Sequence, residues 1–493
     1  MERSKISYIN SGKLITILFF LFACQSKEST PSLPGSAKPF SLPQVELLDG
    51  PFKHATELNI ESLLQYDPDR LLARFRQEAG LEAKAESYGG WEGESLAGHS
   101  LGHHLSACAF MYQTTGQDTF KNRAEYIVAE LAEIQKANGD GYLGAFTNGK
   151  KIFEEEIKNG EIRSQGFDLN GLWSPFYTHH KVLAGLRDAY RLLGIEQALE
   201  VEKGFADWIG TIVLDLDHES VQKMLHCEFG GVQETLADLY LDTQDEKYMK
   251  IARVFHHETI IDSLAMGKDI LPNKHGNTQI PKLIASTRLY EISKDSQDLK
   301  PATFFYDRVV NHHSYVTGGH GNHEYFGQPD QLNFRLSNET TETCNVYNML
   351  KLSRELFLLQ PSAKIADYYE RALFNHILSS QHPESGQVIY NLSLEMGGHK
   401  DYQNPFWFTC CVGSGMETHS KYGANIYYHA ENALFVNQFI ASRLNWEEKG
   451  IQLTQNTRFP EEQQAGFSLE MEAPQTFTLF LRYPYWAEKG IKI

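Results

Sequence analysis

Between about residues 50 and 425, apolar residues recur at helical spacing, and one unit of this pattern repeats. In each copy a helix ends in Tyr or Leu, a short polar turn follows, and a second helix begins. The copies start at Tyr112, Tyr190, Tyr240, Tyr290 and Leu358. Helix pairs of this kind cannot bury their apolar faces alone, so the pattern predicts pairs that stack side by side.

Five or six such pairs in about 375 residues favour a closed (α/α)6 barrel over an open solenoid, because the sequence shows no obvious capping repeat. Gly-rich, aromatic and His-rich segments lie between the pairs, among them YGGWEGESLAGHSLGHHL, LHCEFGGVQE and TGGHGNHEYF. Loops at one end of a rigid scaffold are where sites are usually built. We therefore expect the functional residues in these segments.

After about Ala424 the pattern changes to short alternating runs, such as IQLTQNT, FSLEMEA and TFTLFLRYPYW. These runs predict strands of a partial antiparallel β-sandwich module. The chain stops at Ile493 within what reads as another strand, so we expect a truncation or a fragment that leaves an exposed sheet edge. The predicted fold is mainly α, with the barrel over residues 41–424 and the β module over residues 425–493.

The N-terminal segment predicts export. A basic start precedes the apolar run Leu14–Ala23, which is too short to span a bilayer and has the form of a signal peptide. Its ending, LFAC, resembles a bacterial lipobox. We expect a signal peptide over residues 1–24 and a lipid on Cys24, which anchors the protein at the periplasmic or cell-surface side of a bacterial membrane. Residues 25–40 then read as a flexible tether; ordinary secretion with loss of Cys24 is the alternative.

Composition narrows the class of partner. The 493 residues are too many for one simple core, so we expect one large domain and part of another. The 45 basic and 63 acidic side chains give a net charge of −18, with no basic run, so we expect no nucleic-acid partner. Aromatic residues make up 12% of the chain, which suits stacking on sugars but equally suits a large aromatic core.

The cysteines favour a metal over a disulfide framework. Lipidation of Cys24 would leave five, an odd number at irregular spacing. We expect Cys108 and Cys227 to be buried apolar thiols. His99 and His103 lie four apart on a predicted helix, a spacing that can bind metal. No carboxylate-rich partner set accompanies them, so the lining of a polar pocket is the favoured interpretation.

A second group of residues fits zinc better. Glu342 and Cys344 lie two apart where an amphipathic helix is predicted to start, and Cys410 and Cys411 are adjacent in the aromatic loop NPFWFTCCVGSG. Three thiols and a carboxylate are enough to fill a tetrahedral Zn²⁺ site. We predict one metal cluster from these four residues, with Glu324 nearby as a proton donor. On the residues alone, a closed structural zinc site and a catalytic one both remain open.

The runs GGHGNHEYF, ETC, YNMLKL and TCC resemble the β-L-arabinofuranosidase families of glycoside hydrolases, families 127 and 146. The similarity extends from about Val45 to the end of the chain, through GWEGESLAGHSLGHHLSA, SPFYTHHKVLAGL and HGNTQIPK. The resemblance implies an (α/α)6 barrel followed by β-sandwich modules, a Cys3Glu zinc site, and hydrolysis with retention of configuration.

Carried over position by position, the resemblance makes Cys410 the nucleophile and Glu324 the general acid/base. The implied chemistry is coherent, because coordination to zinc deprotonates a thiol that is mostly protonated at neutral pH. Glu324 would first donate to the leaving oxygen and then accept a proton from water. The implied zinc ligands are Glu342, Cys344, Cys410 and Cys411, and the implied sugar contacts are His180, His275, Glu370 and Tyr390; the two histidines read equally well as core residues.

We therefore expect an exo-glycosidase that removes terminal β-L-arabinofuranose from an arabinose-containing oligo- or polysaccharide of plant type. One alternative keeps the barrel but changes the substrate to another pentofuranoside or a pectic sugar. Another is a lipid-anchored carbohydrate-binding protein with a structural zinc site. A polysaccharide lyase or unsaturated-uronide hydrolase is disfavoured, because those enzymes have no use for ETC together with TCC.

Overall fold

The computed structural model describes residues 2–4, 33–93, 96–487 and 490–492. The predicted lipid anchor at Cys24 and the apolar run before it lie outside these residues. The chain divides into two compact units. The helical unit comprises residues 55–355 and 371–421, and the sheet unit comprises residues 1–54, 356–370 and 422–493. Across the described ranges, each helix is too short or too polar to cross a membrane.

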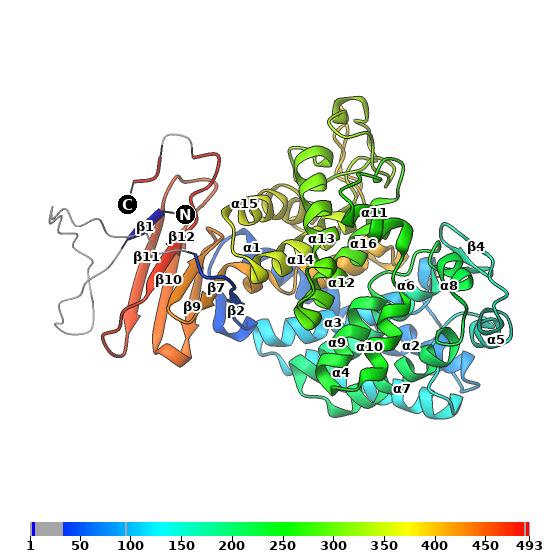
Figure 1. Cartoon of the computed structure of the whole chain (residues 1–493). Helices are drawn as coiled ribbons and strands as arrows, with labels where there is room; N and C mark the ends of the chain where they lie inside the picture. Colours follow the sequence, from blue (N-terminus) through cyan, green and yellow to red (C-terminus); the bar gives the residue numbers. More distant parts are fainter. Residues whose placement is uncertain (1, 5–32, 94–95, 488–489, 493) are drawn as a thin grey trace. The chain divides into compact units, whose positions relative to one another are not determined.

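The helices follow one another through most of the chain (Figure 1). They are α1 (Pro51–Leu64), α2 (Pro68–Glu78), α3 (His99–Thr115), α4 (Asp118–Asn138), α5 (Gly149–Glu155), α6 (Pro175–Leu193), α7 (Glu196–Val213), α8 (His218–Met224), α9 (Val232–Thr243), α10 (Glu246–Val254), α11 (Glu258–Ala265), α12 (Gly276–Ser293), α13 (Ser296–Arg308), α14 (Thr343–Leu359), α15 (Ala363–Ala372) and α16 (Cys410–Thr418).

The predicted helix pairs are confirmed as α3–α4, α6–α7, α9–α10, α12–α13 and α14–α15. In the first four pairs the turn begins with a residue in the left-handed conformation. Gly116 and Gly194 occupy this position in two of them, with φ of 69° in both, and Gln244 and Lys294 occupy it in the others. A left-handed residue ends a helix because its N–H turns back to a carbonyl of the last turn. The polar turns of the sequence repeat therefore mark real helix ends.

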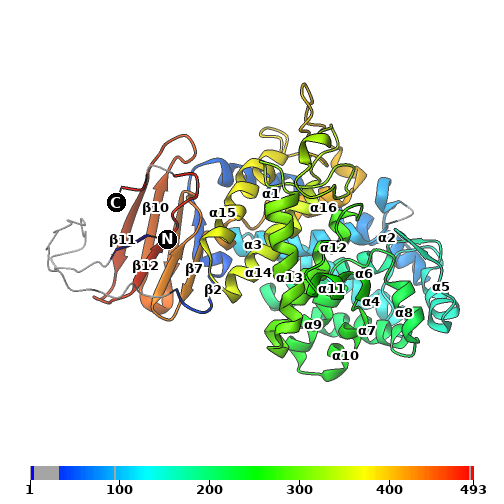
Figure 2. The ribbon, with the colours of Figure 1, turned by 45° about the horizontal axis from the view of Figure 1, so that its top comes forward.

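Successive first helices of the pairs pack side by side (Figure 2). Helix α3 packs on α6, α6 on α9 and α9 on α12, while α16 packs on α3. The second helices α4, α7 and α10 form a corresponding series. Helices α3, α6 and α12 bury polar as well as apolar side chains along most of their length. They therefore form the inner layer of the helical unit, where a polar site can be enclosed.

The sheet unit contains two sheets. Their strands are β1 (Glu2–Ser4), β2 (Lys38–Pro39), β3 (Val45–Leu47), β7 (Tyr427–Ala430), β8 (Ala433–Val436), β9 (Ser442–Trp446), β10 (Ile451–Thr457), β11 (Ala465–Met471) and β12 (Thr478–Leu481). The orders are β1-β12-β8-β7-β2 and β11-β10-β9-β3. The pairing is antiparallel, as predicted, except between β12 and β8, which run parallel.

The N-terminal strands differ from the sequence expectation. Strand β2 lies in the segment predicted to be a tether, and β3 lies in the segment assigned to the barrel, yet β2 pairs with β7 and β3 with β9. Both are too short, at two and three residues, to show a period. The buried rings of Phe435 and Phe480 stack with centroids 4.9 Å apart within this unit.

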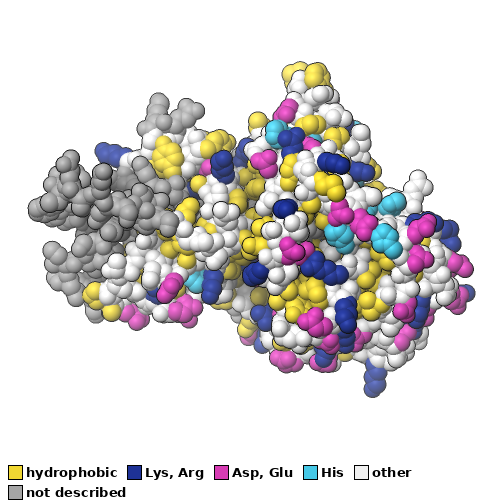
Figure 3. Space-filling view, in the orientation of Figure 1, with side chains coloured by type: hydrophobic (Ala, Val, Ile, Leu, Met, Phe, Trp, Pro, Cys, Tyr) yellow, Lys and Arg dark blue, Asp and Glu magenta, His cyan; other side chains and the backbone are white. Residues whose placement is uncertain are grey.

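Acidic and basic side chains intermingle over the face drawn in Figure 3, where the described residues form no continuous basic surface. This distribution agrees with the net charge of −18.

Candidate active site

The predicted cysteine cluster is assembled from two helix starts. Glu342 immediately precedes α14 and Cys344 lies in its first turn, while Cys410 and Cys411 open α16. The Thr409 hydroxyl caps α16 by accepting the Val412 N–H at 3.4 Å. The helix starts fix the positions of four side chains that are far apart in the sequence.

The four side chains converge on one point. One donor atom from each lies within 4.8 Å of the others, and all four residues are buried. The Cys344 and Cys411 sulfurs are 3.3 Å apart, and the Cys410 sulfur is 3.6 Å from Glu342 Oε1. Glu342 Oε2 is buried with no hydrogen-bond partner among the described residues. Such a convergence of free thiols with an unpartnered carboxylate oxygen fits a metal ion.

The electrostatics of the cluster also call for a cation. Burial raises the pKa of Glu342 well above its usual range. The hydrogen bond with Cys344 and burial raise the pKa of Cys410, and burial raises that of Cys411. Burial opposes ionisation of Cys344 too, but hydrogen bonds from the neighbouring thiols lower its pKa to about 7. The four groups cannot ionise together unless a bound cation offsets their charge.

Glu324 is held by a strained loop and a helix start. It has a left-handed φ of 68°, and its carbonyl accepts the Gly276 N–H at 2.7 Å. The adjacent His275 caps α12 through Nδ1, which accepts from the Thr278 N–H. His275 Nε2 lies 2.8 Å from Glu324 Oε2. Burial opposes ionisation of Glu324, but the hydrogen bond and charge of His275 hold its pKa below the usual value, and the same contact raises the pKa of His275.

One cavity of about 360 Å³ unites these groups. Of the residues predicted from the sequence, its lining contains Cys410, Glu324, Glu342, His275 and Tyr390. The Tyr390 hydroxyl lies 3.5 Å from the Cys410 sulfur. Cys344 and Cys411 belong to the cluster but are not among the residues that line the cavity. One thiol of the cluster and the Glu324 carboxyl therefore line the same cavity.

His180 and Glu370, which were predicted to contact the sugar, lie outside the cavity. His180 is buried outside the cavity lining, and its Nδ1 accepts the Gly231 N–H at 3.0 Å. Glu370 lies in the sheet unit, where its carboxylate accepts hydrogen bonds from the Arg482 guanidinium and the Trp486 indole. The structure thus gives these two residues protein partners and does not bring them to the cavity.

Sequence reasoning missed several lining residues. Glu228 is a third carboxylate in the cavity beside Glu324 and Glu342, and burial raises its pKa. Asn277 and Tyr177 also line it. For Glu228, Asn277 and Tyr177 the only available signal was their position in the loops LHCEFGG, HGNTQ and SPFYTHH, because a loop sequence does not show which side chain turns inward. The sequence did offer Trp91 and Trp173 as candidates for stacking on a sugar, with core packing an equal alternative, and their rings form an aromatic wall of the cavity with centroids 5.0 Å apart.

Comparison with known proteins places this site in a family. The family model of the beta-L-arabinofuranosidase GH127 catalytic domain matches residues 44–424, and that of the GH127 middle domain matches residues 433–493. The chain belongs to the GH127 β-L-arabinofuranosidase family of glycoside hydrolases. It is therefore an enzyme of the glycoside hydrolase class. The comparison with curated proteins found no match.

Solved GH127 structures share the fold. A GH127 β-arabinofuranosidase superimposes with a TM-score of 0.72 at 20% identity, over 92% of this chain and 72% of that one. A GH127 β-L-arabinofuranosidase from Geobacillus stearothermophilus T6 gives 0.69 at 19% identity, over 90% and 75%. These likenesses confirm the predicted toroid of helix pairs followed by a small β-sheet module.

The histidines of α3 in this GH127 chain form part of a buried polar network. His99 Nε2 lies 2.9 Å from the Phe408 carbonyl, and His103 Nδ1 lies 2.5 Å from Glu417 Oε1. The Tyr177 hydroxyl, which reaches the cavity, is 3.4 Å from His103 Nε2. In the described part of the chain, His99 and His103 do not join a group of metal ligands, and neither is among the residues that line the cavity.

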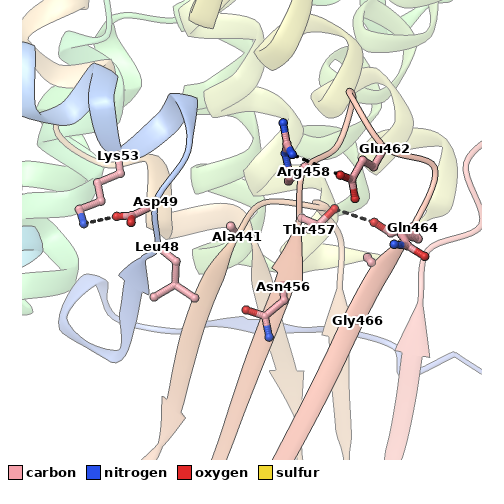
Figure 4. A pocket seen from close by; sticks show the side chains of 11 residues that line it. Leu48, Asp49, Lys53, Ala441, Asn456, Thr457, Arg458, Glu462, Gln464 and Gly466 are labelled. Atoms are coloured by element: carbon pink, nitrogen blue, oxygen red, sulfur yellow. Dashed lines mark hydrogen bonds and ion pairs between the residues drawn. The ribbon is translucent and has the colours of Figure 1, made fainter.

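A separate pocket lies in the sheet unit (Figure 4). Its charged side chains pair with one another: Lys53 Nζ is 2.7 Å from Asp49 Oδ1, and Arg458 Nη1 is 3.4 Å from Glu462 Oε1. The lining has no cysteine or histidine. The candidate active site is therefore the cavity of the helical unit, where the cysteine cluster and Glu324 lie.

Proposed function

We propose that this GH127 enzyme is an exo-acting, retaining β-L-arabinofuranosidase that removes terminal β-L-arabinofuranose from plant-type glycans. The observation that carries the proposal is that Cys410 of the four-residue cluster and Glu324 line one cavity. Its volume of about 360 Å³ lies at the low end of small-molecule sites, as suits a single terminal sugar. A solved relative named as a β-L-arabinofuranosidase supports the choice of sugar.

The donor set supports Zn²⁺ as the metal. Three sulfurs and one carboxylate match the number and softness of ligands that zinc prefers, and hard cations such as Mg²⁺ take oxygen ligands instead. Glu342, Cys344, Cys410 and Cys411 would hold the ion. When bound, Zn²⁺ would keep the sulfurs ionised at neutral pH.

The chain's own residues then divide the reaction into two displacements. In the first, the Cys410 sulfur forms a bond to the anomeric carbon while the bond to the leaving oxygen breaks and Glu324 gives that oxygen its proton. In the second, Glu324 takes a proton from water, whose oxygen displaces the sulfur from the same carbon. Each displacement inverts the anomeric centre, so the two together retain its configuration.

His275 orients Glu324 and sets its pKa. Its Nδ1 accepts the Thr278 N–H, so the ring proton is on Nε2 and is donated to Glu324 Oε2 across 2.8 Å. This hydrogen bond opposes the effect of burial and holds the pKa of Glu324 below its usual value. The proton that Glu324 takes from water in the second displacement is the one it donates to the leaving oxygen in the next turnover, so His275 keeps its own proton throughout.

Replacement of the nucleophile tests the proposal. We expect wild type to release arabinose from an aryl β-L-arabinofuranoside and Cys410→Ser to lower kcat more than about 10³-fold, because a serine hydroxyl cannot be held ionised as a thiolate can. Cys108→Ser, which alters a buried thiol elsewhere, is the matched control and keeps its activity. An electrophilic arabinofuranose mimic followed by peptide mapping should label Cys410.

Other outcomes would redirect the assignment. Label on Glu324 or Glu342 would overturn the role of Cys410. If the enzyme hydrolyses only a different furanoside, the proposed mechanism stands but β-L-arabinofuranose is not the substrate. Glycan binding without any turnover, with Cys410→Ser unfolding the protein, would favour a carbohydrate-binding protein with a structural metal.

A further inference from the structure

A second cavity adjoins the catalytic one. It has a volume of about 880 Å³ and shares Phe167 and Trp173 with the catalytic cavity as a common wall. The rest of its lining comes from α2, which supplies Arg74, from the segment that precedes α5, which supplies Phe146 and Thr147, and from a small sheet that supplies Gln165 and Asp168. Two neighbouring spaces therefore meet at one pair of aromatic side chains.

The small sheet consists of β4 (Ser164–Gln165), β5 (Asp168–Leu169) and β6 (Leu172–Trp173), and it lies near the label β4 in Figure 1. Its second turn is closed by the Asp168 carboxylate, which accepts the Gly171 N–H at 3.1 Å, and Gly171 takes a φ of 87° there. Phe167 lies in the first turn, and its ring meets that of His275 edge to face at 5.0 Å. The sheet is thus anchored directly to a residue of the catalytic cavity.

The second cavity has the chemistry of a sugar site. Trp173 and Phe167 offer rings on which the C–H face of a sugar can pack, and the polar side chains offer both donors and acceptors for hydroxyl groups. Arg74 Nη2 donates to Thr147 Oγ1 at 2.8 Å, so the guanidinium is held in place with other N–H groups to spare. Gln165 is exposed and lines this cavity.

Charge narrows the ligand further. The lining carries one cationic side chain, Arg74, and one anionic side chain, Asp168, so it has no net charge. A neutral, hydroxyl-rich ring suits such a lining better than a uronate does. The catalytic cavity takes the terminal sugar, and the unit that leaves must lie against an adjacent surface.

We propose that the second cavity binds the neutral sugar to which the terminal arabinofuranose is attached, so that the enzyme selects its substrate by the leaving group as well as by the terminal sugar. The assignment rests on the proposed function. Arg74, Gln165 and Asp168 form the polar side of this leaving-group site, and Phe167 and Trp173 connect it to the reacting bond.

Two substrates distinguish binding in the catalytic cavity from binding in the second cavity. Methyl β-L-arabinofuranoside presents only the terminal sugar, and a disaccharide in which β-L-arabinofuranose is attached to a second arabinose presents both units. We expect Gln165→Ala and Arg74→Met each to lower the disaccharide-to-methyl ratio of kcat/KM by about 3- to 10-fold, because each removes a hydrogen bond to the leaving sugar. Arg74→Met also removes the hydrogen bond to Thr147 Oγ1, a loss that acts on both substrates alike and cancels in the ratio. Glu161→Ala, exposed on the same segment and outside both cavities, is the matched control and keeps the ratio.

Each other outcome is decisive. If the disaccharide-to-methyl ratio of kcat/KM is unchanged in both variants, because activity is kept or is lost equally on both substrates, the leaving-group site is wrong. Turnover of the methyl glycoside by wild type would still support the proposed function. If the enzyme cleaves a uronate-linked substrate faster than the neutral disaccharide, and Arg74→Met abolishes this preference, then the second cavity binds an acidic sugar and not a neutral one. If wild type cleaves neither arabinofuranoside, the proposed function fails, and this assignment fails with it.

Discussion

The contact between His275 and Glu324 joins two roles in one side chain. Through Nδ1 the imidazole caps α12, and through Nε2 it holds the carboxyl that faces the cavity. The capping bond fixes the ring, and the fixed ring in turn lowers the pKa of Glu324 against the effect of burial. The start of α12 and the pKa of Glu324 therefore depend on the same residue.

His275→Asn separates the two roles. Asparagine is a preferred helix cap but is too short to reach Glu324 as the imidazole does. Burial then acts alone and raises the pKa of Glu324, so we expect the alkaline limb of the kcat/KM profile to move to higher pH, with kcat about tenfold lower or less. The measurement is a pH–rate profile, with the exposed His218→Asn as control. An alkaline limb that stays in place would show that His275 does not set this pKa.

The sequence is informative about site residues that are held by local spacing. Glu342 and Cys344 lie two apart at a helix start and Cys410 and Cys411 are adjacent, so their joint role is readable without the fold. Glu228 reaches the cavity only because the toroid brings its loop beside that of Glu324, nearly a hundred residues later. Glu370 lies on a predicted helix, but its carboxylate is hydrogen-bonded to the guanidinium of Arg482, more than a hundred residues further along the sequence. The local sequence around Glu370 does not show this partner.

At the scale of elements, the inner layer depends on a close approach between α3 and α6. A side chain on Gly102 would place its Cβ 2.1 Å from the Lys181 carbonyl oxygen, and one on Gly185 would meet the Gly102 carbonyl at 2.7 Å. The two backbones touch at glycines, which leaves no room for side chains between them. This contact holds Tyr177 on α6 against His103 on α3.

We expect Gly102→Ala to lower the free energy of unfolding by about 3 kcal/mol or more, because both clashing atoms belong to backbones that cannot move separately. Gly210→Ala is the matched control: it also lies within a helix, but its Cβ would meet side chains, those of Ile251 and Leu214, and no backbone of another helix. Both changes gain roughly 1 kcal/mol of helix propensity, so urea unfolding of the pair isolates the clash. Equal stabilities would refute the close contact.

Elements were predictable where they are long and repeated. The turns after Tyr112, Tyr190, Tyr240 and Tyr290 located four helix pairs, because each combines polar residues with the end of an apolar stripe. Strands β2 and β3 escaped notice, since two or three residues carry no period and their partners lie nearly 400 residues further along the chain. Pairing over such separations is decided by the fold as a whole.

At the scale of the whole molecule, the interior contains many neutral histidines. Burial lowers the pKa of each below the usual 6.5, to about 3 for His104, His179, His320, His376 and His419. The folded state thus binds fewer protons than the unfolded state between these two values. By linkage their contribution to stability is complete above pH 6.5 and is lost as the pH falls toward 3. Each contributes up to about 1.4 kcal/mol for every pH unit in this window.

His179 provides the clearest test of this acid sensitivity. Its ring lies among those of Phe153, Phe205 and Trp208, and neither nitrogen has a hydrogen-bond partner among the described residues. His179→Leu keeps an apolar side chain of similar size and removes the titration. We expect the variant to lose roughly 2 kcal/mol less stability than wild type between pH 6.5 and pH 5, measured by urea unfolding at both pH values.

The matched control has the opposite sign. His218 is exposed, and its hydrogen bond with Glu258 raises its pKa, so its contribution is complete below the unfolded pKa and is lost as the pH rises through the folded one. His218→Leu should therefore leave the loss toward pH 5 no smaller than in wild type. If both variants behaved alike, burial of neutral histidine could not be the source of the acid sensitivity, and the carboxylates would have to account for it.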